Sequence, residues 1–415
     1  MSNTRKLPLW LAKLGMIFAV LGPGLITASA DNDAPGIATY SMVGSTYGYS
    51  FLWLIIVITI GEVVIQEMAA RMGVVTGKGT ADLIRERFGV KVTTFSMFCL
   101  LLANLGTTIA QFAGIAAAGE LFGISRYISV PIAALFMSFL VLRGSYKRVE
   151  KVLLLLCMSA LSYVVTVFII QPDWGVVLRA AVNPTFSFES GYILAVLAVI
   201  GTTITPWGIF YMQASVADKD VKMEDYPLTR TDVTFGAAWG NIVSAFIIIS
   251  TAATLYVVGI NVDSAEQAAM ALEPLAGSAS SILFAIGLLG ASLLAVSVLP
   301  LSTTYAICES FGFERGLDHH VKAAPVFYGI FAFIVAVAVA VVLIPGIPLF
   351  QIMVLSQSMN AILLPVLLVL VLKLANDPLV MGDWRNKRFG NGLAISLTVL
   401  ISLVTLVLLA SPFIA

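Results

Sequence analysis

Residues 27–39 read TASADNDAPGIAT and interrupt a long apolar segment with polar groups. The polar groups in question are Asp31, Asn32 and Asp33. An uncompensated charge at bilayer depth costs several kcal/mol, so an intramembrane carboxylate is a candidate functional group. Pro35 removes a backbone donor and Gly36 relaxes the backbone, which favours a break in the helix here. Broken helices expose carbonyls and half-helix ends, from which secondary transporters build ion sites at the bilayer midplane.

Composition indicates an all-α, polytopic membrane protein. The chain has 415 residues, of which 59% are hydrophobic and 11% charged, and its mean hydropathy is +0.99. Nearly uncharged runs of about 20 residues recur, the length that crosses a bilayer as helix. A net charge of zero gives no basic surface for nucleic acid, and no such partner is expected. Cys99, Cys157 and Cys308 lie in apolar runs, which favours packing over disulfides.

The apolar pattern predicts eleven spans in a single domain, 1–415. The predicted spans are 14–41, 49–71, 93–121, 124–143, 150–170, 190–216, 233–259, 280–310, 324–343, 347–373 and 391–412. The N-terminal basic residues and the later Ala-Ser-Ala imitate a secretory signal. We interpret this segment as an uncleaved first span, because cleavage would leave the polar break at a free N-terminus.

The basic residues predict the orientation. All but two of the 23 Lys and Arg residues fall on one side of the predicted spans, the exceptions being Arg126 and Arg179. The positive-inside rule therefore places the N-terminus in the cytoplasm and the C-terminus outside the cell membrane.

The sixth predicted span contains a second break. It reads GTTITPWGIFYMQAS from Gly201, with Pro206 following three threonines. Breaks in spans one and six, five spans apart, predict two inverted five-helix repeats, about 14–170 and 190–373, with an ion site between the breaks. The eleventh helix, about 391–412, lies outside the repeats. No nucleophilic triad, phosphate loop or zinc cluster is present in the sequence, so neither an enzyme nor a cofactor is expected.

Several motifs resemble the Nramp family of divalent-metal transporters. They are GPG at 22–24, GYSFLW at 48–53, QEMAARMGVVTGKGTADLIRERFG at 66–89, LSQ at 355–357 and VMGDWRNKRF at 380–389. The resemblance implies a LeuT-like fold, two inverted five-helix repeats plus one helix, with helices one and six broken at the midplane. It also implies a metal site that family members build from Asp-Pro-Gly-Asn in helix one and Met-Pro-His in helix six.

The chain departs from both family motifs. An ungapped comparison puts Asp33 at the family's Asp and Gly36 at its Asn, so the Asn is lost. Thr205 stands at the Met, Trp207 at the His, and Thr202 at the position whose carbonyl binds metal. The metal ligands implied are Asp33, Thr205 and the Thr202 carbonyl. Asp31 and Asn32 are additional polar groups that would either ligate the ion or cap the broken helix.

These exchanges favour a hard ion. A thioether selects transition metals, whereas carboxylate, hydroxyl, carbonyl and water suit Mg²⁺. Mg²⁺ also keeps several of its waters and is usually bound by only one or two carboxylates. The loss of the Met therefore predicts Mg²⁺, and with it Mn²⁺, as substrate. The alternative for Thr205 is a hydroxyl bonded to a local helix carbonyl.

A second set of departures concerns protons. Family members couple metal to H⁺ through acids in helix three, where this chain has Thr108 and Gln111. They also use helix-six histidines, where it has Trp207 and Met212. The only histidines are adjacent, in the loop after span eight. The pattern resembles the Nramp-related magnesium transporter branch and predicts transport uncoupled from protons.

Other polar residues within the spans are weaker candidates. Gln357 and Asn360 would either face the cavity and hold ion-bound water or form a hydrogen bond that packs two helices, and Gln111 is similar. Glu62 would line the ion's exit or pair with a neighbour. Trp207 would fill the space of the family's His by packing.

The main hypothesis is inward transport of largely hydrated Mg²⁺ and Mn²⁺ by a monomer through alternating access. Three alternatives stay open: a proton-coupled Mn²⁺ or Fe²⁺ transporter, a sodium-coupled symporter of organic solutes, and a membrane sensor that does not transport.

Overall fold

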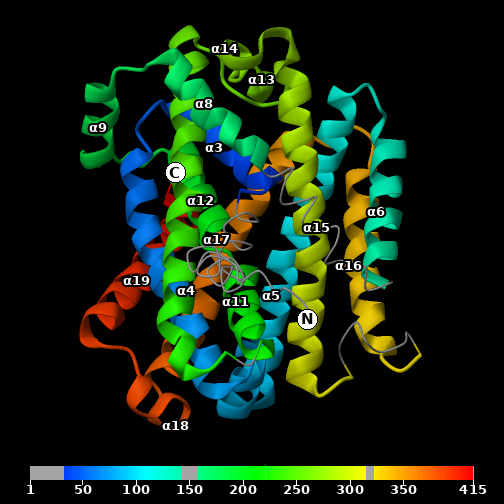
Figure 1. Ribbon diagram of the computed structural model, residues 1–415, viewed down its shortest axis with the longest axis vertical. Helices are drawn as coiled ribbons and strands as arrows, with labels where there is room; N and C mark the ends of the chain where they lie inside the picture. The colour runs from blue at the N-terminus through cyan, green and yellow to red at the C-terminus, as the bar shows by residue number, and fades with distance from the viewer. Residues whose placement is uncertain (1–31, 143–157, 220, 315–321, 415) are drawn as a thin grey trace, which may run out of the picture.

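The computed structural model describes residues 32–142, 158–219, 221–314 and 322–414, and these parts of the chain form helices without strands (Figure 1). The longer helices are α3 (Ala34–Tyr47), α4 (Leu52–Thr76), α5 (Thr80–Leu121), α6 (Arg126–Leu142), α8 (Leu161–Ile170), α10 (Ser190–Thr203), α11 (Pro206–Asp218), α12 (Tyr226–Thr254), α15 (Ser280–Phe311), α16 (Pro325–Val342), α17 (Leu349–Asn376) and α19 (Arg388–Ile414). Four shorter helices, α9 (Trp174–Val182), α13 (Ala265–Met270), α14 (Glu273–Ala276) and α18 (Pro378–Met381), lie in the connections.

Most of these helices are long and apolar enough to cross a membrane. Within the described residues, eight segments meet that criterion by length and composition, and α6 and α8 are shorter apolar helices. Each predicted span from 49–71 onward overlaps a described helix. Residues 14–31 of the first predicted span, 14–41, lie outside the described residues. The prediction of an all-α, multi-pass protein is confirmed for the described part of the chain.

Two helices begin earlier than hydropathy predicts. α5 begins at Thr80 instead of 93, because an amphipathic turn with buried Leu83 and Ile84 joins it through a bend at Gly89. Gly89 has φ 75° and ψ 180°, a conformation that glycine adopts most easily. α12 begins at Tyr226 instead of 233. Hydropathy misses such turns because half of their side chains are polar.

The sixth predicted span is broken, as predicted. α10 ends at Thr203 and α11 begins at Pro206, with Thr205 in an extended conformation between them. Pro206 favours this start, because the first turn of a helix has no intrahelical partner for its backbone N–H groups. In the first predicted span, α3 begins at Ala34, directly after the polar stretch, and runs on to Tyr47.

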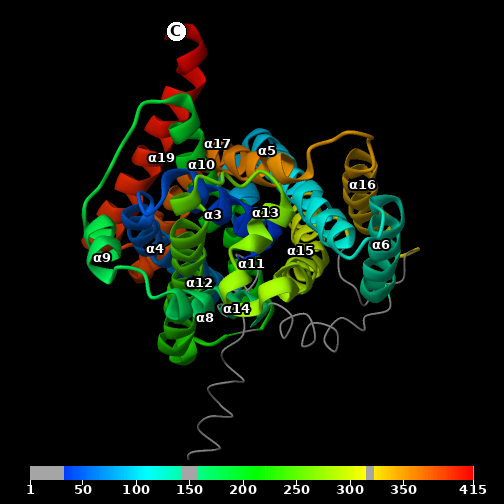
Figure 2. The ribbon, with the colours of Figure 1, turned by 90° about the horizontal axis from the view of Figure 1, so that it is seen from above.

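α3 lies in the middle of the bundle and contacts α5, α10, α12, α15 and α17 (Figure 2). Glycines allow these contacts to be close. An ideal Cβ on Gly44 of α3 would lie 2.0 Å from Thr251 Oγ1 of α12, and one on Gly114 of α5 would lie 2.4 Å from Ala34 Cβ. α3 therefore packs closely on α5 at its start and on α12 near its end.

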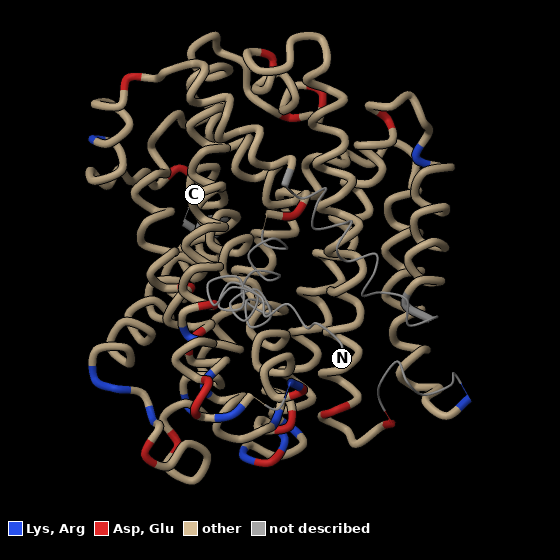
Figure 3. The backbone as a smooth tube through the Cα atoms, in the orientation of Figure 1, with Lys and Arg blue, Asp and Glu red and all other residues tan. Residues whose placement is uncertain are grey.

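The charged residues gather at the ends of the helices. Most of the Lys and Arg lie at the end that carries α18, and few lie at the opposite end, where α9, α13 and α14 are found (Figure 3). This separation is the one that the sequence pattern predicts for the two sides of a membrane protein.

Candidate metal site at the helix breaks

Asp33 lies at the first break and is buried, with 3% of its surface exposed. Its Oδ1 accepts a hydrogen bond from the Gly36 N–H at 2.8 Å, so it caps the N-terminus of α3. Its Oδ2 accepts one from Gln111 Nε2 of α5. The positive end of the α3 dipole and the amide therefore stabilise a carboxylate charge at this point.

The structure describes the contacts of Asn32 but does not describe Asp31. Asn32 Nδ2 donates to the Gly240 carbonyl oxygen at 3.2 Å, and Asn32 Oδ1 accepts from Ser244 Oγ at 3.2 Å. These contacts direct Asn32 toward α12, on which both partners lie. Asp31 lies outside the described residues, and its role as a ligand stays a prediction.

Thr205 lies at the second break. Its hydroxyl accepts a hydrogen bond from the Gly208 N–H at 3.3 Å, which makes it the N-cap of α11. Thr202 is 1% exposed and its Oγ1 has no hydrogen-bond partner among the described residues. Thr203 links the two breaks, because its Oγ1 lies 2.9 Å from the hydroxyl of Tyr40 on α3.

Gln357 and Asn360 form a polar chain between α17 and α5. Asn360 Nδ2 donates to Gln357 Oε1 at 3.0 Å and lies 2.9 Å from Thr107 Oγ1. These hydrogen bonds connect α17 to α5, as expected if the two residues pack the helices together instead of holding ion-bound water. An ideal Cβ on Gly201 of α10 would lie 1.9 Å from the Gln357 carbonyl oxygen, so α17 at this position lies directly beside the end of α10.

Thr108 and Trp207 occupy positions where the family resemblance implies titrating groups. Thr108 Oγ1 donates to the carbonyl oxygen of Asn104, one turn earlier in its own helix. Trp207 packs on Ala295, Val298 and Leu299 of α15. Neither side chain titrates, so the described structure puts no acid or base at these two positions.

Glu62 belongs to a polar cluster with Gln66 and Asn241 that was not predicted from the sequence. Its Oε1 accepts from Gln66 Nε2 at 2.7 Å and its Oε2 from Asn241 Nδ2 at 2.6 Å. Asn241 could have been identified as a partner from the sequence, because it is a polar residue within an apolar span. Ser292 of α15 was missed as well. Its Oγ is buried, has no hydrogen-bond partner in the described part of the chain, and lies 2.5 Å from an ideal Cβ on Gly114.

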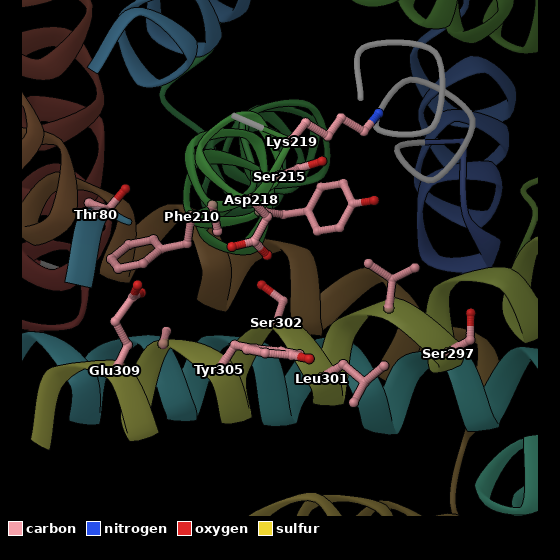
Figure 4. A pocket seen from close by; sticks show the side chains of 14 residues that line it. Thr80, Phe210, Ser215, Asp218, Lys219, Ser297, Leu301, Ser302, Tyr305 and Glu309 are labelled. Atoms are coloured by element: carbon pink, nitrogen blue, oxygen red, sulfur yellow. The ribbon is translucent and has the colours of Figure 1, made fainter. Parts of the chain in front are cut away.

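A larger cavity lies between the C-terminal parts of α11 and α15. It has a volume of about 400 Å³, and its lining includes Asp218, Ser302, Tyr305 and Glu309. Asp218 and Ser302 point toward one another from the two helices (Figure 4). The lining combines the carboxylates of Asp218 and Glu309 with hydroxyl groups and the ammonium group of Lys219, among apolar side chains.

The chemistry of the breaks is that of oxygen donors. One carboxylate, the Thr205 hydroxyl and the backbone carbonyls at the end of α10 suit a hard cation that retains water. Within the described residues, no group of three or more His, Cys, Asp and Glu side chains could hold a metal ion.

Fold and site together define the class of protein. Among solved structures, the crystal structure of MhsT in complex with L-phenylalanine superposes with a TM-score of 0.61 at 16% identity, covering 94% of this chain and 98% of that one. The nucleobase-cation-symport-1 transporter MHP1 gives 0.54 at 14% identity, covering 93% and 89%. The chain therefore has the LeuT-like transporter fold, as predicted, and the break between α10 and α11 lies within the described residues.

The family follows from the sequence. The model for Nramp, "Natural resistance-associated macrophage protein-like", matches residues 24–411, and the chain belongs to this family. The divalent metal cation transporter MntH of Erwinia tasmaniensis is 28% identical over 381 residues, 89% of each chain. MntH of Klebsiella pneumoniae is 27% identical over 385 residues, 90% of each. The crystal structure of the Eremococcus coleocola manganese transporter superposes with a TM-score of 0.78 at 22% identity, over 99% of this chain and 90% of that one.

Proposed function

We propose that this protein moves divalent cations into the cytoplasm by alternating access, with Mg²⁺ and Mn²⁺ as substrates. Family membership and the MntH relatives, which are named divalent metal cation transporters, support the general activity. The further assignment to the Nramp-related magnesium transporter branch rests on this chain's own residues. The single observation that supports it is the N-cap of α11, where a threonine hydroxyl stands.

Selectivity for a hard ion follows from that hydroxyl. Thr205 offers an oxygen atom where the family resemblance implies a thioether. No soft ligand at this position would therefore favour transition metals over Mg²⁺. Asp33 supplies the charge, and the Thr202 carbonyl, Asn32, Asp31 and waters complete the shell. The 400 Å³ cavity between α11 and α15 is wide enough to release an ion that keeps its waters.

The proposed transport is not coupled to protons. Thr108, Gln111 and Trp207 cannot exchange protons at neutral pH. The membrane potential provides sufficient energy, because a divalent cation gains roughly 4.6 kcal/mol from 100 mV, inside negative. That energy supports about a thousandfold accumulation.

The proposed orientation has the N-terminus in the cytoplasm and the C-terminus outside, in the cell membrane, with the monomer as the working unit. The separation of Lys and Arg toward the α18 end supports it. The cavity between α11 and α15 then opens toward the cytoplasm.

A second candidate is a proton-coupled Mn²⁺ transporter. The relative of known structure is named a manganese transporter. In this chain the thioether of Met353 lies 3.7 Å from an ideal Cβ on Gly114, the residue that packs on Ala34. A soft atom is therefore near the first break, although it comes from α17 rather than α11.

Uptake of radioactive Mn²⁺ into cells that express the full chain tests the general activity. We expect uptake that Mg²⁺ inhibits and that Asp33→Asn abolishes. Asn retains the helix cap, so this variant removes the charge and leaves α3 capped. Asp263→Ala, on an exposed connection, is the matched control and should transport normally. Normal uptake by Asp33→Asn would contradict the proposal.

A further inference from the structure

The short helix α9, in the connection between α8 and α10, exposes apolar side chains. Trp174, Leu178 and Val182 recur every four residues and form a stripe along it. Leu178 is 64% exposed and Val182 73%. Val177, on another side of α9, is buried, and the helix contacts α4. α9 is thus apolar both where it packs on the bundle and where it faces outward, and a helix that is apolar all round is normally covered by protein or by a membrane.

The residues that follow α9 continue this apolar surface. Phe186 and Phe188 are both exposed, Phe188 by 80%, and their rings pack edge to face with centroids 5.1 Å apart. Arg179 of α9 is exposed as well. Aromatic rings and a long basic side chain are typical of the headgroup level of a bilayer, where an apolar part and a polar tip are both accommodated.

The position of α9 also favours contact with lipid. The helix lies at the periphery of the bundle, beside α4, in both ribbon views (Figures 1 and 2). The ring of Trp174 lies 6.3 Å from that of Phe168 on α8, which in turn lies 6.0 Å from Phe246 on α12. α8 and α12 are apolar helices of a multi-pass membrane protein. The exposed face of α9 therefore continues the surface that these helices present to the acyl chains.

The same connection is joined to the two helices that meet the breaks. Thr185 Oγ1 donates to the Ser50 carbonyl oxygen, just after α3, at 3.1 Å. The Tyr192 hydroxyl, in the first turn of α10, donates to the Thr185 carbonyl oxygen at 2.8 Å. The Tyr192 ring lies 5.9 Å from Phe186 and 5.3 Å from Tyr47 of α3. The connection thus links the ends of α3 and α10 that are remote from the breaks.

We propose that α9 and residues 183–188 lie in the headgroup region of the phospholipid bilayer and anchor the ends of α3 and α10 there. The apolar stripe would contact acyl chains, and the Arg179 guanidinium would contact lipid phosphate, to which it is complementary in charge. Helices of this kind bury their apolar face about 5–10 Å into the boundary between headgroups and acyl chains. The inference does not depend on the proposed ion transport and is measured without metal ions.

The test places spin labels on the full chain in nanodiscs of phosphatidylcholine and phosphatidylglycerol. The labels are attached to Leu178→Cys or Asp263→Cys, in a chain whose three natural cysteines are replaced by alanine. Collisions with oxygen, which concentrates in lipid, are compared with collisions with a water-soluble nickel chelate. Asp263, exposed on another connection at the same end of the bundle, is the matched control. We expect the label at 178 to favour oxygen and the label at 263 to favour nickel.

Two outcomes would overturn the proposal. Equal nickel accessibility at both positions would place α9 in water, and low accessibility of position 178 to both reagents would mean that a second copy of the chain covers it. If the cysteine replacements prevent folding, quenching by lipids brominated on their acyl chains repeats the test with the natural cysteines. The difference between wild type and Trp174→Phe isolates the emission of Trp174, which these lipids should quench strongly; no quenching of it would overturn the proposal.

Hydrogen exchange tests the anchoring. Leu178→Asp combined with Val182→Asp removes the apolar stripe at two exposed positions. In nanodiscs we expect this variant to exchange the backbone amides of residues 193–197, at the start of α10, severalfold faster than wild type. Asp263→Ala should exchange them at the wild-type rate. Unchanged exchange in the double variant would contradict an anchor that holds α10.

Discussion

Gln111 of α5 donates a hydrogen bond from its Nε2 to Oδ2 of Asp33, which joins the middle of one long helix to the cap of another. The second oxygen of Asp33 is occupied by the Gly36 N–H at 2.8 Å. Gln111 Oε1 is buried without a hydrogen-bond partner among the described residues. The amide therefore orients the carboxylate, and we propose that its own oxygen contacts the ion or an ion-bound water.

Gln111→Ala should weaken metal uptake at low ion concentration. A hydrogen bond to a charged group contributes about 1.5–3 kcal/mol, so losing it should raise the KM for the divalent ion by about tenfold or more. The control is Gln351→Ala, an exposed glutamine on α17. Initial uptake rates over a range of ion concentrations measure the effect. An unchanged KM would show that Gln111 does not position Asp33.

Thr205→Met should change selectivity toward Mn²⁺. A thioether favours transition metals over Mg²⁺, and we expect the ratio of Mn²⁺ to Mg²⁺ uptake to rise by about tenfold. Thr205→Val removes the cap hydroxyl without adding sulfur and separates the two effects. The same rise in both variants would mean that loss of the cap, and not softness, sets selectivity.

Gly201→Ala should destabilise the protein. Its new Cβ would lie 1.9 Å from the Gln357 carbonyl oxygen and 2.8 Å from the Ala361 nitrogen, backbone atoms that cannot move without shifting α17. We expect a loss of about 1–3 kcal/mol or more, seen as a lower melting temperature. Gly329→Ala, on α16 with nothing within 4 Å, is the matched control and should melt like wild type.

Asp377 should make stability depend on pH at the α18 end. Burial acts to raise the pKa of Asp377, but hydrogen bonds from the Leu379 N–H and Arg87, together with the Arg87 charge, lower it below its ordinary value. A folded-state pKa below the unfolded one stabilises the protein at neutral pH. That stability is lost as pH falls through the folded-state pKa.

Asp377→Asn should therefore be slightly less stable than wild type at pH 7, by about 0.5 kcal/mol at a solvated surface, and the difference should disappear as the pH falls through the folded-state pKa. Unfolding measured over a series of acidic pH values follows the difference, and high salt should reduce it. Glu86→Gln, which breaks an exposed ion pair with Lys78, should have a smaller effect. A difference that grows in acid would contradict the assigned sign.

The breaks could be predicted from the sequence because local chemistry determines them. Pro206 after three threonines, and Pro35 after two aspartates and an asparagine, each specify a helix start. The structure then gives the caps as Thr205 and Asp33. The early start of α5 was not predictable from hydropathy, because Arg85 and Arg87 make its first turns appear as a loop.

The partners of the buried polar groups were less accessible to sequence reasoning. Glu62 could be identified as an unusual acid within a span, but its pairing with Asn241 joins residues 179 positions apart. The contact of Asn32 with α12 likewise spans 208 positions. Such pairs depend on how the helices pack, which periodicity within one helix does not specify.

The most direct test of the proposed function measures Mg²⁺ entry into proteoliposomes that contain a Mg²⁺-sensitive dye and a pH dye, with wild type and Asp33→Asn side by side. We expect wild type to admit Mg²⁺ under an inside-negative potential without acidification of the lumen, and Asp33→Asn to admit none. Exclusion of Mg²⁺ together with Mn²⁺ entry that acidifies the lumen would contradict it and would identify a proton-coupled manganese transporter.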